Sequence, residues 1–197
     1  MIYPVVVYGH PVLRKKSREV RKDEEGLSEF IKDLWETMYV SDGIGLAAPQ
    51  VGKSVRIFVI DAEALAEDDA TLKGFKKTFI NPKIVEKNGD KEPFNEGCLS
   101  IPNIREDVIR EPGIRIQYYD QEFNFFDEEY DGIASRIIQH EYDHLEGILF
   151  TDLVPPLRKR LLKSKLNAIS KGKFEATYKT ILPKKKLNPD SLNQDTR

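Results

Sequence analysis

The sequence contains a single cysteine and no long apolar run, and each scarcity excludes a class of protein. With Cys98 alone, no internal disulfide framework can form, so we expect a reducing, cytoplasmic environment. No apolar run approaches the roughly 20 residues that cross a bilayer, so we expect no membrane span. The opening MIYPVVVYGHP lacks the basic start and the long apolar stretch of a signal peptide.

What is present is the composition of an ordinary globular protein. Hydrophobic residues make up 40% and charged residues 32% of the 197 positions, which argues against global disorder. A chain of this length buries roughly 70% of the surface that its extended form exposes, which is enough for one core. We therefore expect one domain with at most an appendage.

The net charge of −2 conceals an uneven distribution. The segment from Leu157 to Arg197 holds 12 basic and 3 acidic residues, a net charge of +9. Residues 1–156 hold the remaining 19 basic and 30 acidic residues, a net charge of −11. The sequence thus combines an acidic body with a basic end.

Apolar periodicity predicts helices over residues 27–39 and 131–145, the second ending at Gly147. A basic helix is expected over residues 157–170, after the break at Pro155-Pro156. The last twenty-odd residues are polar and are expected to be weakly ordered.

Short apolar runs between tight turns predict antiparallel strands. One hairpin is expected at Asn88-Gly89 and a second at Asp120-Gln121. We interpret the acidic stretch 61–77 as a surface excursion. The strands are expected over residues 55–60, 78–80, 84–87, 114–119 and 122–126.

The strongest chemical signal is the HExxH pattern His140-Glu141-Tyr142-Asp143-His144 on the second helix. Two histidines at i and i+4 share one helix face, so both imidazoles can reach one metal ion. Glu141 lies beside them, where it can take a proton from a water on that ion. The pattern predicts a catalytic metal site rather than a pair of solvated histidines.

A third metal ligand must lie elsewhere in the sequence, and few residues qualify. The metzincin pattern would need histidine where Phe150 stands, and the thermolysin pattern would need an acidic residue near Ser164. His10 lies in a Gly-His-Pro turn that suggests a structural role. Cys98, in EGCLS, remains, although a free cysteine is more often a packing residue. A Cys/His/His set with an open fourth position has catalytic geometry.

Two further features have both a functional and a packing interpretation. Ile133 and Ile137 continue the stripe of the two histidines, so they either line an apolar pocket beside the metal or belong to the core. The loop GIGLAAPQVG, residues 43–52, includes Gln50, whose amide can stabilise an oxyanion. Taken alone, this loop is better explained as a turn of small packing residues.

Together, GIGLAAPQVG, EGCLS and QHEYDHLEG resemble the three signature motifs of bacterial peptide deformylase, over residues 3–153. The resemblance implies an α+β fold, with antiparallel sheets packed around the HExxH helix and a further C-terminal helix. It implies a catalytic domain over residues 1–154 and a basic helix with a weakly ordered tail over 155–197. The implied reaction removes the N-formyl group from the formylmethionine of new polypeptides and releases formate.

The resemblance also implies a role for individual residues. Cys98, His140 and His144 would bind one divalent ion, ferrous iron natively, with zinc or nickel able to replace it. Glu141 would be the general base and then the general acid. The implied oxyanion donors are Gln50 and the backbone N–H of Leu99, and the implied substrate-binding residues are Ile44, Gly45, Arg105, Ile133 and Ile137.

The chain departs from the usual pattern at its acidic excursion, at Arg136 and at its long basic end. As a hypothesis, the basic end docks a monomeric enzyme on ribosomal RNA through phosphate contacts. One alternative function is a zinc metallopeptidase with a third ligand other than Cys98. Another is a non-catalytic metal-binding or ribosome-associated protein, which the presence of Glu141 and Gln50 disfavours.

Overall fold

The computed structural model describes residues 1–184 and folds them into an α+β architecture of three α-helices and three small sheets. None of the helices within these residues has the length and apolar character needed to cross a membrane. The α-helices are α1 (Leu27–Val40), α2 (Gly132–Glu146) and α3 (Pro156–Ser170). The strands are β1 (Val5–Val6), β2 (Gly45–Ala47), β3 (Ile57–Asp61), β4 (Lys76–Asn88), β5 (Glu92–Cys98), β6 (Ile101–Arg110), β7 (Gly113–Tyr119), β8 (Phe125–Tyr130) and β9 (Thr180–Ile181).

The largest sheet is antiparallel, with strand order β2-β3-β4-β7-β8. Successive residues of β3 point to opposite faces, and both faces are covered. Phe58 and Ile60 pack with Ile138 of α2, whereas Ile57 and Val59 belong to the cluster that includes residues of α1. Burial on both faces explains why the first four residues of β3 are all apolar. Such a continuous apolar run allows a buried strand to be predicted from sequence alone.

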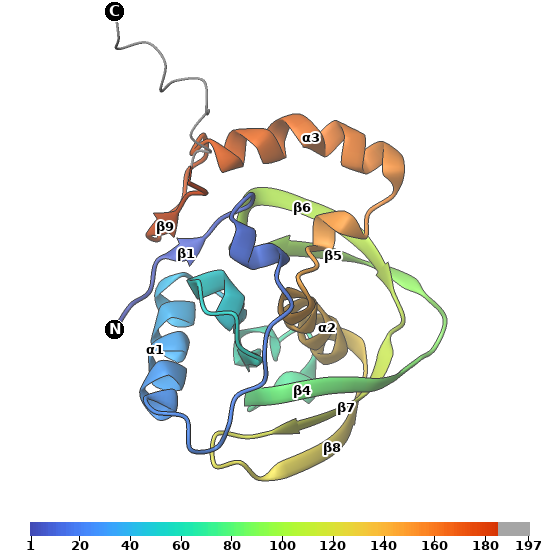
Figure 1. Ribbon diagram of the computed structural model, residues 1–197. Helices are drawn as coiled ribbons and strands as arrows, with labels where there is room; N and C mark the ends of the chain where they lie inside the picture. The colour runs from blue at the N-terminus through green and yellow to red at the C-terminus, as the bar shows by residue number, and fades with distance from the viewer. Residues whose placement is uncertain (185–197) are drawn as a thin grey trace, which may run out of the picture.

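Helix α2 lies at the centre of the molecule, between the strands β4, β7 and β8 on one side and the β5–β6 hairpin on the other (Figure 1). Its apolar residues Ala134, Ile138 and Leu145 belong to the core cluster of the large sheet. Gly147 ends the helix in the left-handed region, φ 75°, as its position after the apolar pattern predicts. The expected helix carrying HExxH is confirmed.

Helix α3 covers the β5–β6 hairpin (Figure 1). Leu162, Leu166 and Ile169 of α3 share a core cluster with Ile101 and Val108 of β6. Residues of β6 are alternately buried and exposed along the strand, as expected for a strand with one solvated face.

Three expectations need correction. The turn at Asn88-Gly89 does not close a hairpin, because β4 pairs with β3 and β7 while β5 pairs with β6. The acidic stretch 61–77 is not wholly a surface excursion, since Leu72 is fully buried. The C-terminal segment is ordered as far as residue 184, because β9 pairs in parallel with β1 and Phe174 packs on the core. Residues 185–197 of the expected tail lie outside the described residues.

Two other elements extend the expectations. The hairpin β7–β8 forms as predicted, with a longer turn over residues 120–124. Part of the loop 43–52 is the edge strand β2, which pairs with β3.

Candidate metal centre

Cys98, His140 and His144 come together where the end of β5 meets α2. One ligand atom of each residue lies within 4.8 Å of those of the other two. The Cys98 Sγ and His144 Nε2 atoms are 3.3 Å apart. The i, i+4 spacing supplies the two imidazoles from adjacent turns of one helix, and the β5–β6 hairpin supplies the thiol across from them.

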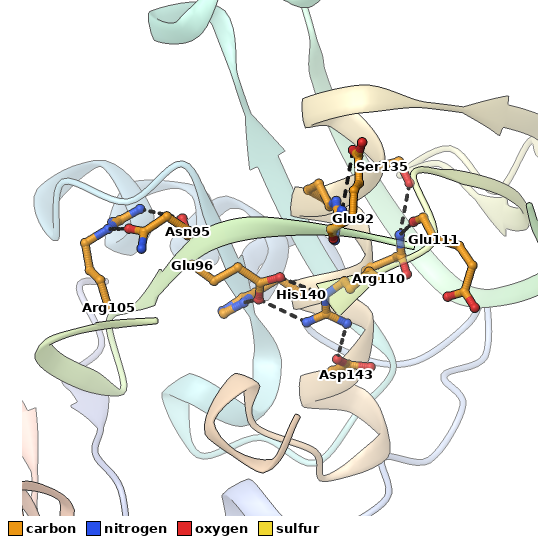
Figure 2. A network of polar contacts seen from close by, with 11 residues as sticks. Glu92, Asn95, Glu96, Arg105, Arg110, Glu111, Ser135, His140 and Asp143 are labelled. Carbon is orange, nitrogen blue, oxygen red and sulfur yellow. Dashed lines mark hydrogen bonds and ion pairs between the residues drawn. The ribbon is translucent and has the colours of Figure 1, made fainter. Parts of the chain in front are cut away.

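A buried carboxylate orients His140. Glu96 Oε2 lies 2.9 Å from His140 Nδ1, which leaves Nε2 facing the other ligands. Glu96 in turn accepts two hydrogen bonds from Arg110, at 2.7 and 3.0 Å, and Arg110 also donates to Asp143 at 2.7 Å. Figure 2 shows the Glu96 carboxylate held between His140 and Arg110.

The electrostatics of this network follow from burial and pairing. Burial opposes ionisation of Glu96, but the hydrogen bonds from His140 and Arg110 outweigh it and lower the pKa of Glu96 to about 2. Glu96 therefore keeps its negative charge at neutral pH and holds His140 through Nδ1. Glu96, Arg110 and Asp143 were not expected from the sequence, although Glu96 lies in EGCLS and Asp143 lies within HExxH.

The donor set fits a divalent metal ion. Burial lowers the pKa of His144, so its imidazole is neutral and has a lone pair to donate. Within residues 1–184, His144 Nδ1 has no hydrogen-bond partner. A thiolate and two imidazoles suit zinc, iron, cobalt or nickel, and three protein ligands leave an open coordination position.

Glu141 lies beside the candidate ligands in a tightly packed position. Its Oε2 atom is buried and has no hydrogen-bond partner among the described residues. Burial raises the pKa of Glu141 to about 7, which suits a group that both accepts and returns a proton near neutral pH. Gly45 packs against it so closely that a Cβ atom there would lie 2.6 Å from Glu141 Oε1.

Gln50 is held with its amide nitrogen directed at the site. Its Oε1 atom accepts a hydrogen bond of 2.8 Å from the N–H of Ala47, and its Nε2 atom lies 3.4 Å from Cys98 Sγ. Leu99 follows Cys98 in the turn between β5 and β6. The carbonyl oxygen of Leu99 accepts a 2.7 Å hydrogen bond from the hydroxyl of Tyr178, a residue that the sequence analysis did not single out.

The site opens into a cleft of about 1030 Å³. Arg136, at which the chain departs from the usual pattern, is buried within the wall of this cleft and donates from Nη2 to the Glu92 carbonyl at 2.6 Å. His10 has the expected structural place, because its Nδ1 accepts from the Val12 N–H at 3.2 Å. The five expected substrate-binding residues all line the cleft: Ile44, Gly45, Arg105, Ile133 and Ile137.

Comparison with known proteins shows which family this chain resembles. Residues 2–160 match the family model described as polypeptide deformylase. A peptide deformylase from Christiangramia forsetii is 51% identical over 193 residues, which cover 94% of this chain and 98% of that protein.

Solved structures show the same similarity. The structure of peptide deformylase from Thermotoga maritima matches with 40% identity and a TM-score of 0.71, covering 79% of this chain and 99% of that one. A Plasmodium falciparum peptide deformylase in complex with an inhibitor matches with 38% identity and a TM-score of 0.74, covering 85% and 99%.

Proposed function

This chain belongs to the peptide deformylase family, hydrolases that remove the N-formyl group from newly made polypeptides, and we propose that Cys98, His140 and His144 hold the metal ion on which its activity depends. The observation that supports this assignment is the meeting of the three ligand atoms within 4.8 Å, beside the buried carboxyl of Glu141. We propose ferrous iron as the native ion, with zinc or nickel able to replace it.

The bound ion would supply a Lewis acid that polarises the formyl group and activates water. Glu141 takes a proton from the attacking water as the water oxygen bonds to the formyl carbon. When the C–N bond breaks, Glu141 gives the proton to the departing amine, which leaves formate and a free N-terminus. The Gln50 amide and the Leu99 N–H donate to the oxygen that gains negative charge in the tetrahedral intermediate.

The cleft suits an extended peptide with an apolar first side chain. Strand β2 is an edge of the large sheet, so the backbone of Gly45 would pair with a substrate chain as an added strand. The backbone of Ile44, just before this strand, would extend the contact beside its carbonyl, which already accepts a 2.9 Å hydrogen bond from the Asp61 N–H. Ile44, Ile133 and Ile137 line the cleft near the candidate ligands and would contact the methionine side chain. Arg105 lines the same cleft and would contact the chain downstream.

The test is formate release from formyl-Met peptides by protein purified anaerobically, together with its metal content. Glu141→Ala should keep the ion and lose turnover by roughly 100-fold or more, because the general base is removed while the ligands remain. Retained turnover in this variant would reject the role of Glu141. Cleavage of unformylated peptides by the wild type would instead favour a metallopeptidase.

We also propose that the basic end of the chain contacts ribosomal RNA and that the enzyme works as a cytoplasmic monomer. On this view, residues 1–154 are the catalytic part and residues 155–197 the basic part. Lys159 and Lys163 are exposed one turn apart on α3 and can both reach phosphates.

Reversing both α3 charges, with Lys159→Glu and Lys163→Glu, should weaken ribosome co-sedimentation at low salt and reduce its salt dependence. The matched control reverses two exposed lysines elsewhere, Lys22→Glu and Lys53→Glu. Equal loss in both pairs would show that only net charge matters and would reject α3 as the contact.

A further inference from the structure

The chain returns to the active site after α3. We name residues 171–184 the C-terminal strap. Phe174 packs on the core cluster of α3 and β6, and the Asn103 side chain donates a 3.0 Å hydrogen bond to the carbonyl of Glu175. Strand β9 then pairs with β1, where the Val5 N–H donates to the Lys179 carbonyl at 2.8 Å. The strap is thus fixed to the body at three separate points.

The strap and β1 together hold the turn that follows Cys98. The hydroxyl of Tyr178 donates to the Leu99 carbonyl at 2.7 Å. One residue further along the turn, the Ser100 carbonyl accepts a 2.8 Å hydrogen bond from the N–H of Tyr8, which follows β1. Both carbonyls of the turn are therefore held by residues that flank the paired strands β1 and β9, and neither Tyr8 nor Tyr178 belongs to the three sequence motifs.

We infer that Tyr178 is a positioning residue for deformylation, which fixes the direction of the Leu99 N–H by holding the Leu99 carbonyl. This inference rests on the proposed role of that N–H as an oxyanion donor. Strand β5 restrains the backbone before Leu99, and the hydroxyl of Tyr178 restrains it afterwards. Without the hydroxyl of Tyr178, the Leu99 carbonyl loses its hydrogen bond and the backbone after the Leu99 N–H can move. An oxyanion donor is effective only when it already points at the position of the oxyanion before the reaction begins.

The state of the hydroxyl suits this role. Burial raises the pKa of Tyr178 to about 12, so the hydroxyl keeps the proton that it donates. Tyr178 also lines the cleft, and its ring would remain in a phenylalanine variant. Removal of the hydroxyl alone therefore tests positioning separately from packing.

Deleting an oxyanion donor costs about 100- to 1000-fold in kcat. Because Tyr178→Phe loosens the donor without removing it, we expect kcat to fall by about 5- to 20-fold with KM within about twofold. The matched control is Tyr39→Phe, which removes a hydroxyl that donates to Asp61 at 2.6 Å on the exposed side of α1. This control should lower kcat by less than about twofold.

The experiment compares three properties of the wild type and the two variants. Kinetics of formate release from a formyl-Met peptide give kcat and KM separately. Metal analysis gives the ion bound per chain. Hydrogen exchange followed by mass spectrometry, without substrate, reports on the backbone of residues 97–101. Tyr178→Phe should show the fall in kcat, an unchanged metal content and faster exchange in this peptide.

Each contrary result has a distinct meaning. An unchanged kcat with unchanged exchange, a loss confined to KM, or a loss of metal would overturn the positioning role of Tyr178. Faster exchange with an unchanged kcat would show that Tyr178 holds the turn but that the Leu99 N–H is not an oxyanion donor, which overturns both assignments. A wild type that releases no formate would refute the proposed function itself, and the inference with it.

Discussion

The close contact between Gly45 and Glu141 predicts a severe effect of one methyl group. In Gly45→Ala the new Cβ would lie 2.6 Å from Glu141 Oε1 and 2.9 Å from its Cγ and Cδ. The φ angle of Gly45 lies outside the left-handed region, so alanine brings no backbone strain there. The penalty therefore comes from the contact with Glu141, whose buried carboxyl group would have to shift away from its position beside the candidate ligands.

The size of the effect follows from the distance. To restore an ordinary contact of 3.4 Å, the two groups must separate by about 0.8 Å. Overpacking of this kind costs about 1–3 kcal/mol, and a shift of about 1 Å in a catalytic group costs about 100-fold. We expect kcat/KM to fall by about 30- to 100-fold. A loss of about 2 kcal/mol would lower the melting temperature by about 4–8 °C.

The assay is formate release, paired with thermal unfolding and metal analysis of the same samples. Metal content should stay unchanged because the three atoms nearest to the added Cβ all belong to Glu141, which is not a candidate ligand. In a Glu141→Ala background the stability cost of Gly45→Ala should fall to within about 0.5 kcal/mol, since the clashing group is gone. Activity within threefold of wild type and an unchanged melting temperature would refute the reasoning.

Three further predictions concern the ligand set, its supporting network and a distant carboxylate. Cys98→Ser should lower metal stoichiometry well below that of the wild type, because a neutral hydroxyl is a weaker ligand than thiolate, and metal analysis after gel filtration checks this. Arg110→Met should cost about 3–5 kcal/mol in chemical denaturation, because it leaves Glu96 buried without its cation, whereas a cost below about 1 kcal/mol would contradict the role of the network. Glu128 accepts a 2.6 Å hydrogen bond from Tyr118, and such bonds outweigh burial and lower the pKa of Glu128. A lowered pKa stabilises the fold above the unfolded value of about 4.3, and this contribution is lost as the pH falls from there through the lowered pKa of Glu128. The melting temperatures of wild type and Glu128→Gln should therefore converge over that range, and a constant difference would count against this.

The parts of the fold that the sequence predicts are those with local signals. The apolar stripes of α2 and the glycine after it, Gly147, predict where this helix lies. The two histidines of HExxH are one helical turn apart, so the helix alone places them on the same face. The pairing of β5 with β6 does not follow in this way. Asn88-Gly89 marks a turn, but a turn signal does not say whether the strands on either side of it pair.

The supporting residues of the site depend on contacts between distant segments. Arg110 reaches Glu96 across a hairpin, and Tyr178 reaches Leu99 over a separation of 79 residues. No periodicity or spacing links such positions, and a polar composition in the segment after α3 predicts weak order. The segment is nevertheless ordered because the side chain of Phe174 packs on a core cluster and the backbone of β9 pairs with β1.

The pairing of the two chain ends has a consequence for how the molecule comes apart. Strands β1 and β9 are two residues each, so few backbone hydrogen bonds join them. The other attachments of the strap are the side chain of Phe174 and single hydrogen bonds at Glu175 and Tyr178, so the strap can detach while the cores around α2 and α3 remain folded. On warming, we expect the strap to open before the global transition, so that catalysis declines at temperatures where circular dichroism still reports an intact fold.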